Sequence, residues 1–162
     1  MCGSDVHTIT GGWGQALLPV CVGHEIIGKV IAVGPKTTTV KIGDRVGVGA
    51  QVWACLECKA CKSGNENYCS QQIGESVLSR KTSPRSMLTP FPDTYNCYYP
   101  DKSMAYGGYS SHVRAHEYFV FAIPDSLESS IAAPMLCAGI TTFSPLWRAK
   151  IGPGKTIGVV GM

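Results

Sequence analysis

Short apolar runs rich in valine, isoleucine and glycine dominate the first part of the chain and predict a mainly β protein. Residues 26–34 (IIGKVIAVG) and 40–50 (VKIGDRVGVGA) are predicted strands, because β-branched side chains favour a pleated surface and the glycines between them favour turns. Two further short strands are expected within residues 108–124. Residues 71–107 show no regular period, so we expect a long surface insertion there, with a solvated loop at 80–85 (RKTSPR).

The pattern changes near residue 125, where we place a boundary between a first domain (1–125) and a second segment (126–162). Alanines and apolar spacing favour helix in most of the second segment, with Pro134 and Pro145 breaking it into two short pieces. Residues 155–161 (KTIGVVG) then have the pattern of a buried strand that enters a glycine turn, as before the G-x-G-x-x-G of dinucleotide-binding folds. By itself this stretch does not distinguish a cofactor-binding strand from any other buried strand before a turn.

Composition and charge narrow the function classes. The chain has 162 residues and a formal net charge of +3, and it has no long basic run that would indicate nucleic acid binding. Its longest apolar stretches are too short to span a bilayer, and its N-terminus lacks the layout of a signal peptide. We therefore expect a soluble cytoplasmic protein without nucleic-acid or membrane partners. In such a protein, eight cysteines indicate bound metal rather than disulfides.

Four cysteines in one loop form the most specific chemical motif. Cys55, Cys58, Cys61 and Cys69 follow the spacing C-x2-C-x2-C-x7-C. Gaps of two residues let successive thiolates turn toward one point, which suits the four ligands of a structural zinc ion. An iron–sulfur cluster is the main alternative, although the common bacterial continuation x3-C-P is absent, and disulfides are a third interpretation. A zinc site closed by four protein ligands would fold the loop and carry out no chemistry.

A second set of metal-type ligands, Cys2, His24 and Cys137, is dispersed along the chain. Two cysteines and one histidine leave a fourth position open for water or substrate, which is the layout of a catalytic zinc. Asp5 and Glu25 lie beside these residues in the sequence and are candidates for hydrogen bonds that orient them. Each residue also has a structural interpretation, because a lone cysteine is usually a small core hydrophobe and a lone histidine a hydrogen-bonded core residue. Spacing leaves both interpretations open.

In combination these motifs resemble one enzyme family. Residues 23–46 (GHEIIGKVIAVGPKTTTVKIGDRV) contain the G-H-E-x2-G and G-D-x-V signature of the zinc-dependent medium-chain alcohol dehydrogenases, and the four-cysteine loop follows soon after. CGSDVH (2–7) and LCAGITTFSPL (136–146) match the other two ligand segments of that family in the right order. Within the family, the sequence resembles the cinnamyl alcohol dehydrogenase branch, whose fungal members are typically NADP-dependent.

The resemblance implies a GroES-like β-barrel catalytic domain, with short helices leading into the first strand of a Rossmann domain that binds NADP or NAD. It implies two zinc ions per chain: a catalytic zinc on Cys2, His24 and Cys137, and a structural zinc on the four-cysteine loop. The implied reaction interconverts a primary alcohol and an aldehyde by hydride transfer, with zinc as the Lewis acid that lowers the pKa of the alcohol. It also implies a homodimer for the full-length form.

The resemblance assigns roles to residues around the catalytic zinc. Glu25 is the neighbour that approaches the metal transiently, and Asp5 orients His24. Ser4 and His7 stand where the family places its proton relay, with a turn serine and a surface histidine as the structural alternatives. Trp13 and Trp53 are assigned to the substrate pocket, with packing in the core as the alternative. Thr141 is assigned to the vicinity of the nicotinamide, and Gly161 to the first glycine of the cofactor fingerprint.

Two departures from the family pattern affect the expected function. The chain reaches only the first fingerprint glycine, and Met1 directly precedes a zinc ligand where family members have strands, so the sequence resembles an enzyme truncated at both ends. We therefore expect the isolated chain to bind zinc but to turn over little or no alcohol, with sheet edges and apolar surface exposed. The alternative is a non-enzymatic GroES-like zinc module, while a co-chaperonin would rest on fold analogy alone.

Cys21 and Cys97 belong to neither set of zinc ligands. Cys21 lies between two valines, and we expect it to be buried packing. Cys97 lies in the irregular insertion, where we expect an exposed thiol. Neither residue is assigned a function.

Overall fold

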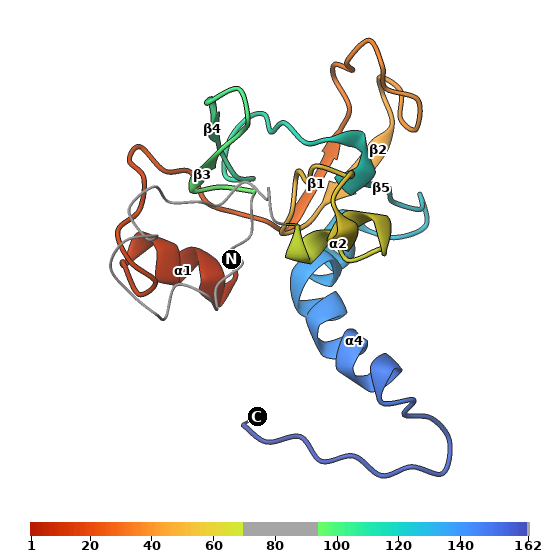
Figure 1. Ribbon diagram of the computed structural model, residues 1–162. Helices are drawn as coiled ribbons and strands as arrows, with labels where there is room; N and C mark the ends of the chain where they lie inside the picture. The colour runs from red at the N-terminus through yellow and green to blue at the C-terminus, as the bar shows by residue number, and fades with distance from the viewer. Residues whose placement is uncertain (70–93, 162) are drawn as a thin grey trace.

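The structure is a computed structural model that describes residues 1–69 and 94–161 (Figure 1). In chain order its elements are α1 (Gly3–Ile9), β1 (Ile26–Lys29), β2 (Arg45–Val48), α2 (Lys59–Lys62), the 3-10 helix η1 (Glu66–Tyr68), β3 (Cys97–Tyr98), β4 (Met104–Ala105), the 3-10 helix η4 (Glu117–Phe119), β5 (Val120–Ala122), α3 (Ser129–Pro134), the π-helical η5 (Met135–Gly139) and α4 (Ile140–Arg148). In Figure 1, α1 lies on one side of the molecule and α4 projects away from the strands. The part of the expected insertion up to residue 93, including the loop at 80–85, lies outside the described residues.

An antiparallel three-stranded sheet, in the order β1–β2–β5, forms the centre of the fold. Ile26 of β1 lies opposite Val48 of β2, and Val48 in turn lies opposite Val120 of β5. Successive side chains of a strand point to opposite faces, so Val46 and Val48 share one face, and both are buried. The strands predicted at 26–34 and 40–50 are thus present, but shorter than expected, because ladder pairing between them holds for only four residues of each.

The segment from 94 to 107 belongs to the core, and the prediction that it is part of a surface insertion is wrong. It forms the β3–β4 hairpin, in which Cys97, Tyr99 and Ala105 are buried and pack with Val48. The prediction of an exposed thiol at Cys97 is also wrong, since this side chain is only 5% exposed. Pattern analysis misses the hairpin because each of its strands has two residues, too few to show an alternation.

Residues 107–109 run beside residues 21–23 and hold the chain just before His24. The N–H groups of Gly107, Gly108 and Tyr109 donate to the carbonyl oxygens of Cys21, Gly23 and Val22 over 2.8, 2.8 and 3.0 Å. Cys21 is half-buried at this contact. Of the two strands predicted within 108–124, only β5 is a regular strand, and η4 directly precedes it.

Residues 129–148 form one continuous helix rather than two pieces separated by the prolines. Pro134 is the last residue of α3, and the π-helical turn of η5 follows it directly. A wider turn of this kind accommodates a locally disrupted hydrogen-bond ladder, which explains how the helix continues past a residue without an N–H. Pro145 lies within α4 and does not end it either.

By length and composition alone, the 20-residue helix from Ser129 to Arg148 is long and apolar enough to cross a membrane. This corrects the expectation that every apolar stretch of the chain is too short. Helices of soluble proteins pass the same test, and the first part of this helix packs on the sheet, where Ala132 is 1% exposed. A single helix of this kind is weak evidence for a membrane span.

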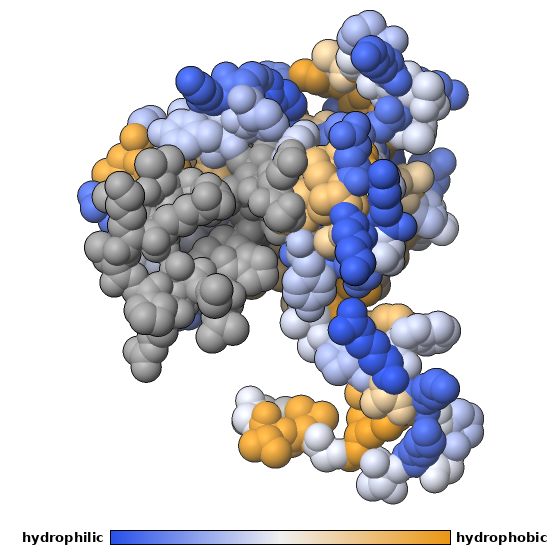
Figure 2. Space-filling view, in the orientation of Figure 1, coloured by the Kyte–Doolittle hydropathy of each residue, from blue (hydrophilic) through white to orange (hydrophobic). Residues whose placement is uncertain are grey.

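The tail after α4 is not the buried strand that its sequence predicts. Residues 155–161 have no regular secondary structure, and Val159 and Val160 are 70% and 100% exposed. A strand is stable only when its backbone groups find partners in a ladder, and no described segment pairs with this one. The side chains of Phe143 and Trp147 on α4 are exposed too, so apolar residues lie on the surface of this end of the molecule (Figure 2).

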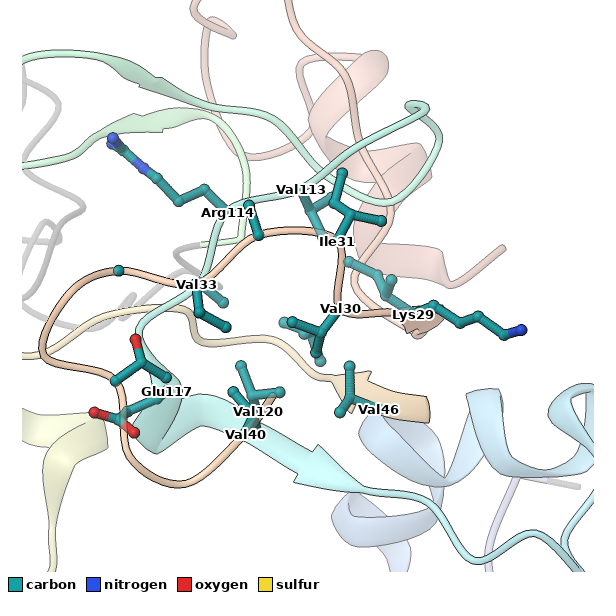
Figure 3. A pocket seen from close by; sticks show the side chains of 17 residues that line it. Lys29, Val30, Ile31, Val33, Val40, Val46, Val113, Arg114, Glu117 and Val120 are labelled. Atoms are coloured by element: carbon teal, nitrogen blue, oxygen red, sulfur yellow. The ribbon is translucent and has the colours of Figure 1, made fainter. Parts of the chain in front are cut away.

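An apolar cavity of about 510 Å³ opens beside β1, an edge strand of the sheet. Figure 3 shows the side chains of Val33, Val40, Val46 and Val120 gathered around it, with the charged end of Lys29 directed away. Most of its other lining residues are also aliphatic. Ile31 and Val33, which line it beyond the end of β1, are 63% and 43% exposed, in agreement with the exposed apolar surface expected from the sequence.

Replacing Gly49 is expected to destabilise the fold because β2 and η5 approach closely there. A Cβ at Gly49 would lie 2.8 Å from the carbonyl oxygen of Leu136, and a backbone atom cannot move aside as a side chain can. Gly49→Ala should therefore lower the free energy of unfolding by about 2 kcal/mol, within the range for overpacked sites. Gly28→Ala in β1 is the control, since a Cβ there meets nothing within 4 Å. Equal unfolding midpoints for both variants in urea would contradict this close approach.

Candidate metal centres

Three ligand-type side chains from distant parts of the sequence meet at one point. Nε2 of His24 lies 3.1 Å from Sγ of Cys137, and Sγ of Cys2 lies 4.0 Å from the same sulfur. All three ligand atoms lie within 4.8 Å of one another. The residues come from the start of α1, from the segment before β1 and from η5. Folding therefore assembles the cluster that the sequence spacing leaves open.

The buried carboxylate of Asp5 joins two of these ligand segments. Oδ2 accepts a hydrogen bond of 2.9 Å from the N–H of Cys2, which caps the first turn of α1. Oδ1 lies 3.0 Å from Nδ1 of His24 and accepts a bond of 3.1 Å from the N–H of Gly23. Gly23 has a φ of +108°, which strains any residue with a side chain, so glycine allows its N–H to meet Asp5. One side chain thus caps α1 and orients the histidine.

His24 has the environment of a metal ligand. Its ring is 1% exposed, and the Asp5 carboxylate can only accept at Nδ1, so the proton lies on Nδ1 and the lone pair of Nε2 faces Cys137. Tetrahedral zinc, with bonds of about 2.1 Å to nitrogen and 2.3 Å to sulfur, separates such ligand atoms by about 3.5–3.8 Å. The distances of 3.1 and 4.0 Å lie on either side of this range. Two cysteines and one histidine are nevertheless a donor set that suits zinc, and they leave a fourth coordination position open.

The pKa values around this cluster reflect its burial. Burial raises the pKa of the Asp5 carboxyl, but hydrogen bonds from the N–H of Cys2, the O–H of Tyr95 and the ring of His24 outweigh burial and lower it. Burial and the neighbouring Cys2 thiol raise the pKa of Cys137 to about 12. A bound divalent cation reverses the preference of such a thiol, because it favours the thiolate.

The four-cysteine loop folds into a second, closed cluster. The sulfurs of Cys55, Cys58, Cys61 and Cys69 lie within 4.8 Å of one another, and four of their separations are 3.4, 3.5, 3.9 and 3.9 Å. Sulfurs bound to one tetrahedral zinc lie about 3.8 Å apart, whereas a disulfide requires about 2.05 Å. The geometry therefore fits a structural zinc and excludes disulfides within the loop.

Backbone groups and core residues hold this loop in place. The N–H of Cys58 donates to the sulfur of Cys55 over 3.3 Å, and such backbone bonds lower the pKa of Cys55. Burial raises the pKa of Cys61 to about 12, since this thiol packs with Ala54 and Phe119 in the core. A metal at this cluster has to displace thiol protons, so its binding is coupled to folding of the loop.

The structure brings some of the other predicted residues to the open cluster. Sγ of Cys2 lies 3.7 Å from Oγ of Ser4, which is half-buried. Glu25 lines a cavity of about 280 Å³ together with Asp5 and His24. Ser4 therefore lies beside one ligand, and Glu25 lines the same cavity as His24; their roles stay predictions.

The remaining predicted residues are more exposed or belong to the core. His7 is exposed, and its ring stacks on Trp13 with centroids 5.2 Å apart. Trp53 is half-buried and packs against the core cluster of β2 and the β3–β4 hairpin. Thr141 is exposed on α4, four residues after the ligand in η5, and Gly161 lies in the exposed tail with a φ of +88°.

Sequence patterns do not single out Tyr95, although it contacts this site. Tyr95 is 2% exposed, and its hydroxyl lies 3.5 Å from Nδ1 of His24. Tyr95 is not selected from the sequence because it lies within residues 71–107, which are predicted to be a surface insertion. An alternating pattern in the hairpin after Tyr95 would have indicated that this segment is buried, but strands of two residues are too short to show an alternation.

Loss of one ligand of the closed cluster is expected to remove one zinc and destabilise its loop. Cys61→Ala should reduce bound zinc from two ions per chain to one, measured by elemental analysis under reducing conditions, because the open cluster shares no residue with the loop. Cys97→Ala is the control, since Cys97 is buried but belongs to neither cluster, and it should keep both ions. A Cys61→Ala variant with two zinc ions would contradict the assignment.

Comparison with known proteins identifies the family of this chain. Residues 1–125 match the family model described as the alcohol dehydrogenase GroES-like domain. NADP-dependent alcohol dehydrogenase 6 of Saccharomyces cerevisiae is 47% identical over 163 residues, which cover 100% of this chain and 40% of that protein. Cinnamyl alcohol dehydrogenase 8 of Arabidopsis thaliana is 42% identical, again over 100% of this chain and 40% of that protein.

A solved structure shows the same relationship in three dimensions. The crystal structure of CAD from Helicobacter pylori, complexed with NADP(H), superposes with a TM-score of 0.82 and 35% sequence identity. The match covers 99% of this chain and 42% of that one, so the chain spans about two fifths of the proteins it resembles. These matches confirm the predicted GroES-like fold: the chain belongs to the family of the alcohol dehydrogenase GroES-like domain.

Proposed function

We propose that this chain is the zinc-binding catalytic part of an NADP-dependent alcohol dehydrogenase that interconverts primary alcohols and aldehydes. One observation carries the proposal: Cys2, His24 and Cys137 converge from distant segments into a metal site with an open position. Relatives named as NADP-dependent and cinnamyl alcohol dehydrogenases support the choice of reaction and cofactor. The relative is longer, since this chain covers 40% of it, so the activity is proposed for a protein of that length.

The residues in and around the open cluster would bind the metal and orient its ligands. Cys2, His24 and Cys137 would hold zinc, which when bound supplies a Lewis acid that lowers the pKa of an alcohol. Asp5 fixes the tautomer and orientation of His24, so that the lone pair of Nε2 would face the metal. Glu25, next to His24 in the sequence, would approach the metal transiently.

A proton path leads from the cluster along α1. Oγ of Ser4 lies beside Cys2 and can accept the alcohol proton while donating its own. His7 follows three residues later on the same helix, so the two side chains share a face, and its exposed ring can exchange the proton with solvent. The relay therefore ends at the surface, with the ring of His7 held against Trp13.

The proposed contacts with cofactor and substrate rest on the family resemblance and on where the residues concerned lie in the structure. Thr141 follows Cys137 by four residues in one continuous helix, so both lie on one face, near where a nicotinamide would meet the alcohol. Gly161, with its positive φ, suits the first turn of a dinucleotide-binding loop. Trp13 would contribute an apolar wall to the substrate pocket, while Trp53 supports the core.

We further propose a soluble, cytoplasmic protein that acts on small-molecule alcohols or aldehydes and whose full-length form is a homodimer. The mild net charge of +3 supports the absence of a nucleic-acid partner. Two thiol clusters at metal-binding rather than disulfide distances support a reducing compartment. A non-enzymatic zinc module would have no need of an open site, which is why we favour the enzyme.

A chimaera with the yeast relative tests the proposed function. Residues 1–162 replace the matched segment of NADP-dependent alcohol dehydrogenase 6, and NADP-linked oxidation of primary alcohols is measured. We expect turnover that depends on zinc and is lost in Cys137→Ala. A folded chimaera with two zinc ions per chain and no turnover would contradict the proposal. The isolated chain, assayed in parallel, tests the prediction that these residues alone turn over little or no alcohol.

Ser4→Ala in the same chimaera tests the proton relay. Removing the hydroxyl should lower kcat by about 100-fold, the lower range for general acid–base groups, with two zinc ions still bound. Thr10→Ala is the matched control, because this hydroxyl lies at the other end of α1 and is exposed. Equal kcat values for the two variants would mean that Ser4 has only a structural role in α1.

A further inference from the structure

Tyr95 contacts the open metal cluster from a part of the chain that supplies none of its ligands. It precedes β3, is 2% exposed, and its ring centroid lies 5.8 Å from that of His24 at an angle of 51°. Its hydroxyl lies 3.5 Å from Nδ1 of His24 and also forms a side-chain hydrogen bond with Asp5. The phenol therefore sits over the Asp5–His24 pair, on the side of the ring away from the metal-facing Nε2.

Donor and acceptor counting shows which contact the hydroxyl makes. Nδ1 of His24 carries one proton, and it is engaged by Asp5 at 3.0 Å, whereas the Tyr95 oxygen is at 3.5 Å, beyond ordinary hydrogen-bond length. Tyr95 thus cannot be the main partner of the histidine. Its O–H donates instead to the Asp5 carboxylate.

The Asp5 carboxylate has room for this donor. An ionised carboxylate accepts at about four positions, and the N–H groups of Cys2 and Gly23 and the ring of His24 occupy three of them. The Tyr95 hydroxyl is the fourth donor. Because Asp5 is 1% exposed and held by these donors, removal of one of them would let the carboxylate turn toward its remaining partners.

We propose that Tyr95 is a positioning residue of the catalytic metal centre: its hydroxyl fixes the Asp5 carboxylate, and through it the orientation in which His24 presents Nε2 to the metal. This deepens the proposed function and rests on it. Tyr95 touches neither the metal nor the substrate, so its effect has to appear in the metal affinity and the ligand geometry of the open site. The closed four-cysteine site, which shares no residue with this network, is an internal reference.

The test compares Tyr95→Phe with Tyr99→Phe in the 162-residue chain. Tyr99 is a matched control, because it is a buried tyrosine of the same hairpin whose hydroxyl donates to the backbone oxygen of Arg114. Both changes remove one buried hydroxyl. Each variant is loaded with zinc at the four-cysteine site and titrated with cobalt(II), whose visible spectrum reports the affinity and geometry of the open site.

We expect Tyr95→Phe to weaken cobalt binding at the open site by about tenfold, the lower range for residues that support a metal ligand, and to change the cobalt spectrum. Tyr99→Phe should leave both unchanged, even if it lowers the thermal unfolding midpoint as much. In an Asp5→Asn background, Tyr95→Phe should have no further effect on affinity, because the two residues act in series.

Three other results would contradict the positioning role of Tyr95 or the metal site itself. Cobalt affinity and spectrum equal to those of the unmodified chain in Tyr95→Phe would overturn the positioning role and leave the proposed function standing. An undiminished tenfold effect in the Asp5→Asn background would show that Tyr95 does not act through Asp5, and would overturn it too. Failure of the unmodified chain to bind cobalt at the open site would instead overturn the metal site from which the proposed function is argued, and the chimaera would then test that function separately.

Discussion

The carboxylate of Asp5 is the interaction on which the open metal site depends. It accepts from the N–H of Cys2, from the N–H of Gly23 and from the ring of His24, all within 2.9 to 3.1 Å. These bonds join α1 to the segment before β1, which are separate in sequence, and they set the tautomer of the histidine. A buried charge is tolerated only when it is fully hydrogen-bonded, so the same contacts that satisfy the carboxylate bring two zinc ligands together.

The third ligand depends on how the long helix packs against the sheet. Cys137 lies in the π-helical turn η5, and π turns are frequent at functional sites because they turn a side chain out of the regular helical register. The contact between Gly49 and Leu136 lets this turn approach the end of β2. The open cluster is thus a product of tertiary structure, whereas the four-cysteine cluster lies within one loop.

This difference explains what the sequence could predict. The C-x2-C-x2-C-x7-C spacing defines the closed site locally, so its four ligands, from Cys55 to Cys69, could be assigned from the sequence alone. The open site could be assigned only through family resemblance, since nothing in the spacing of Cys2, His24 and Cys137 shows that they meet. Tyr95, the β3–β4 hairpin and the continuity of the helix past Pro134 were missed, because short strands carry no period and tertiary packing outweighs local propensity.

Zinc K-edge X-ray absorption of the purified chain, with elemental analysis of the same sample, tests the central claim most directly. The account predicts two zinc ions per chain and a histidine contribution, with an average of about three sulfurs per zinc, because one site has four sulfur ligands and the other has two sulfurs and one nitrogen. One zinc per chain with four sulfurs and no histidine would contradict it, since Asp5 would then not bring Cys2, His24 and Cys137 into one metal site.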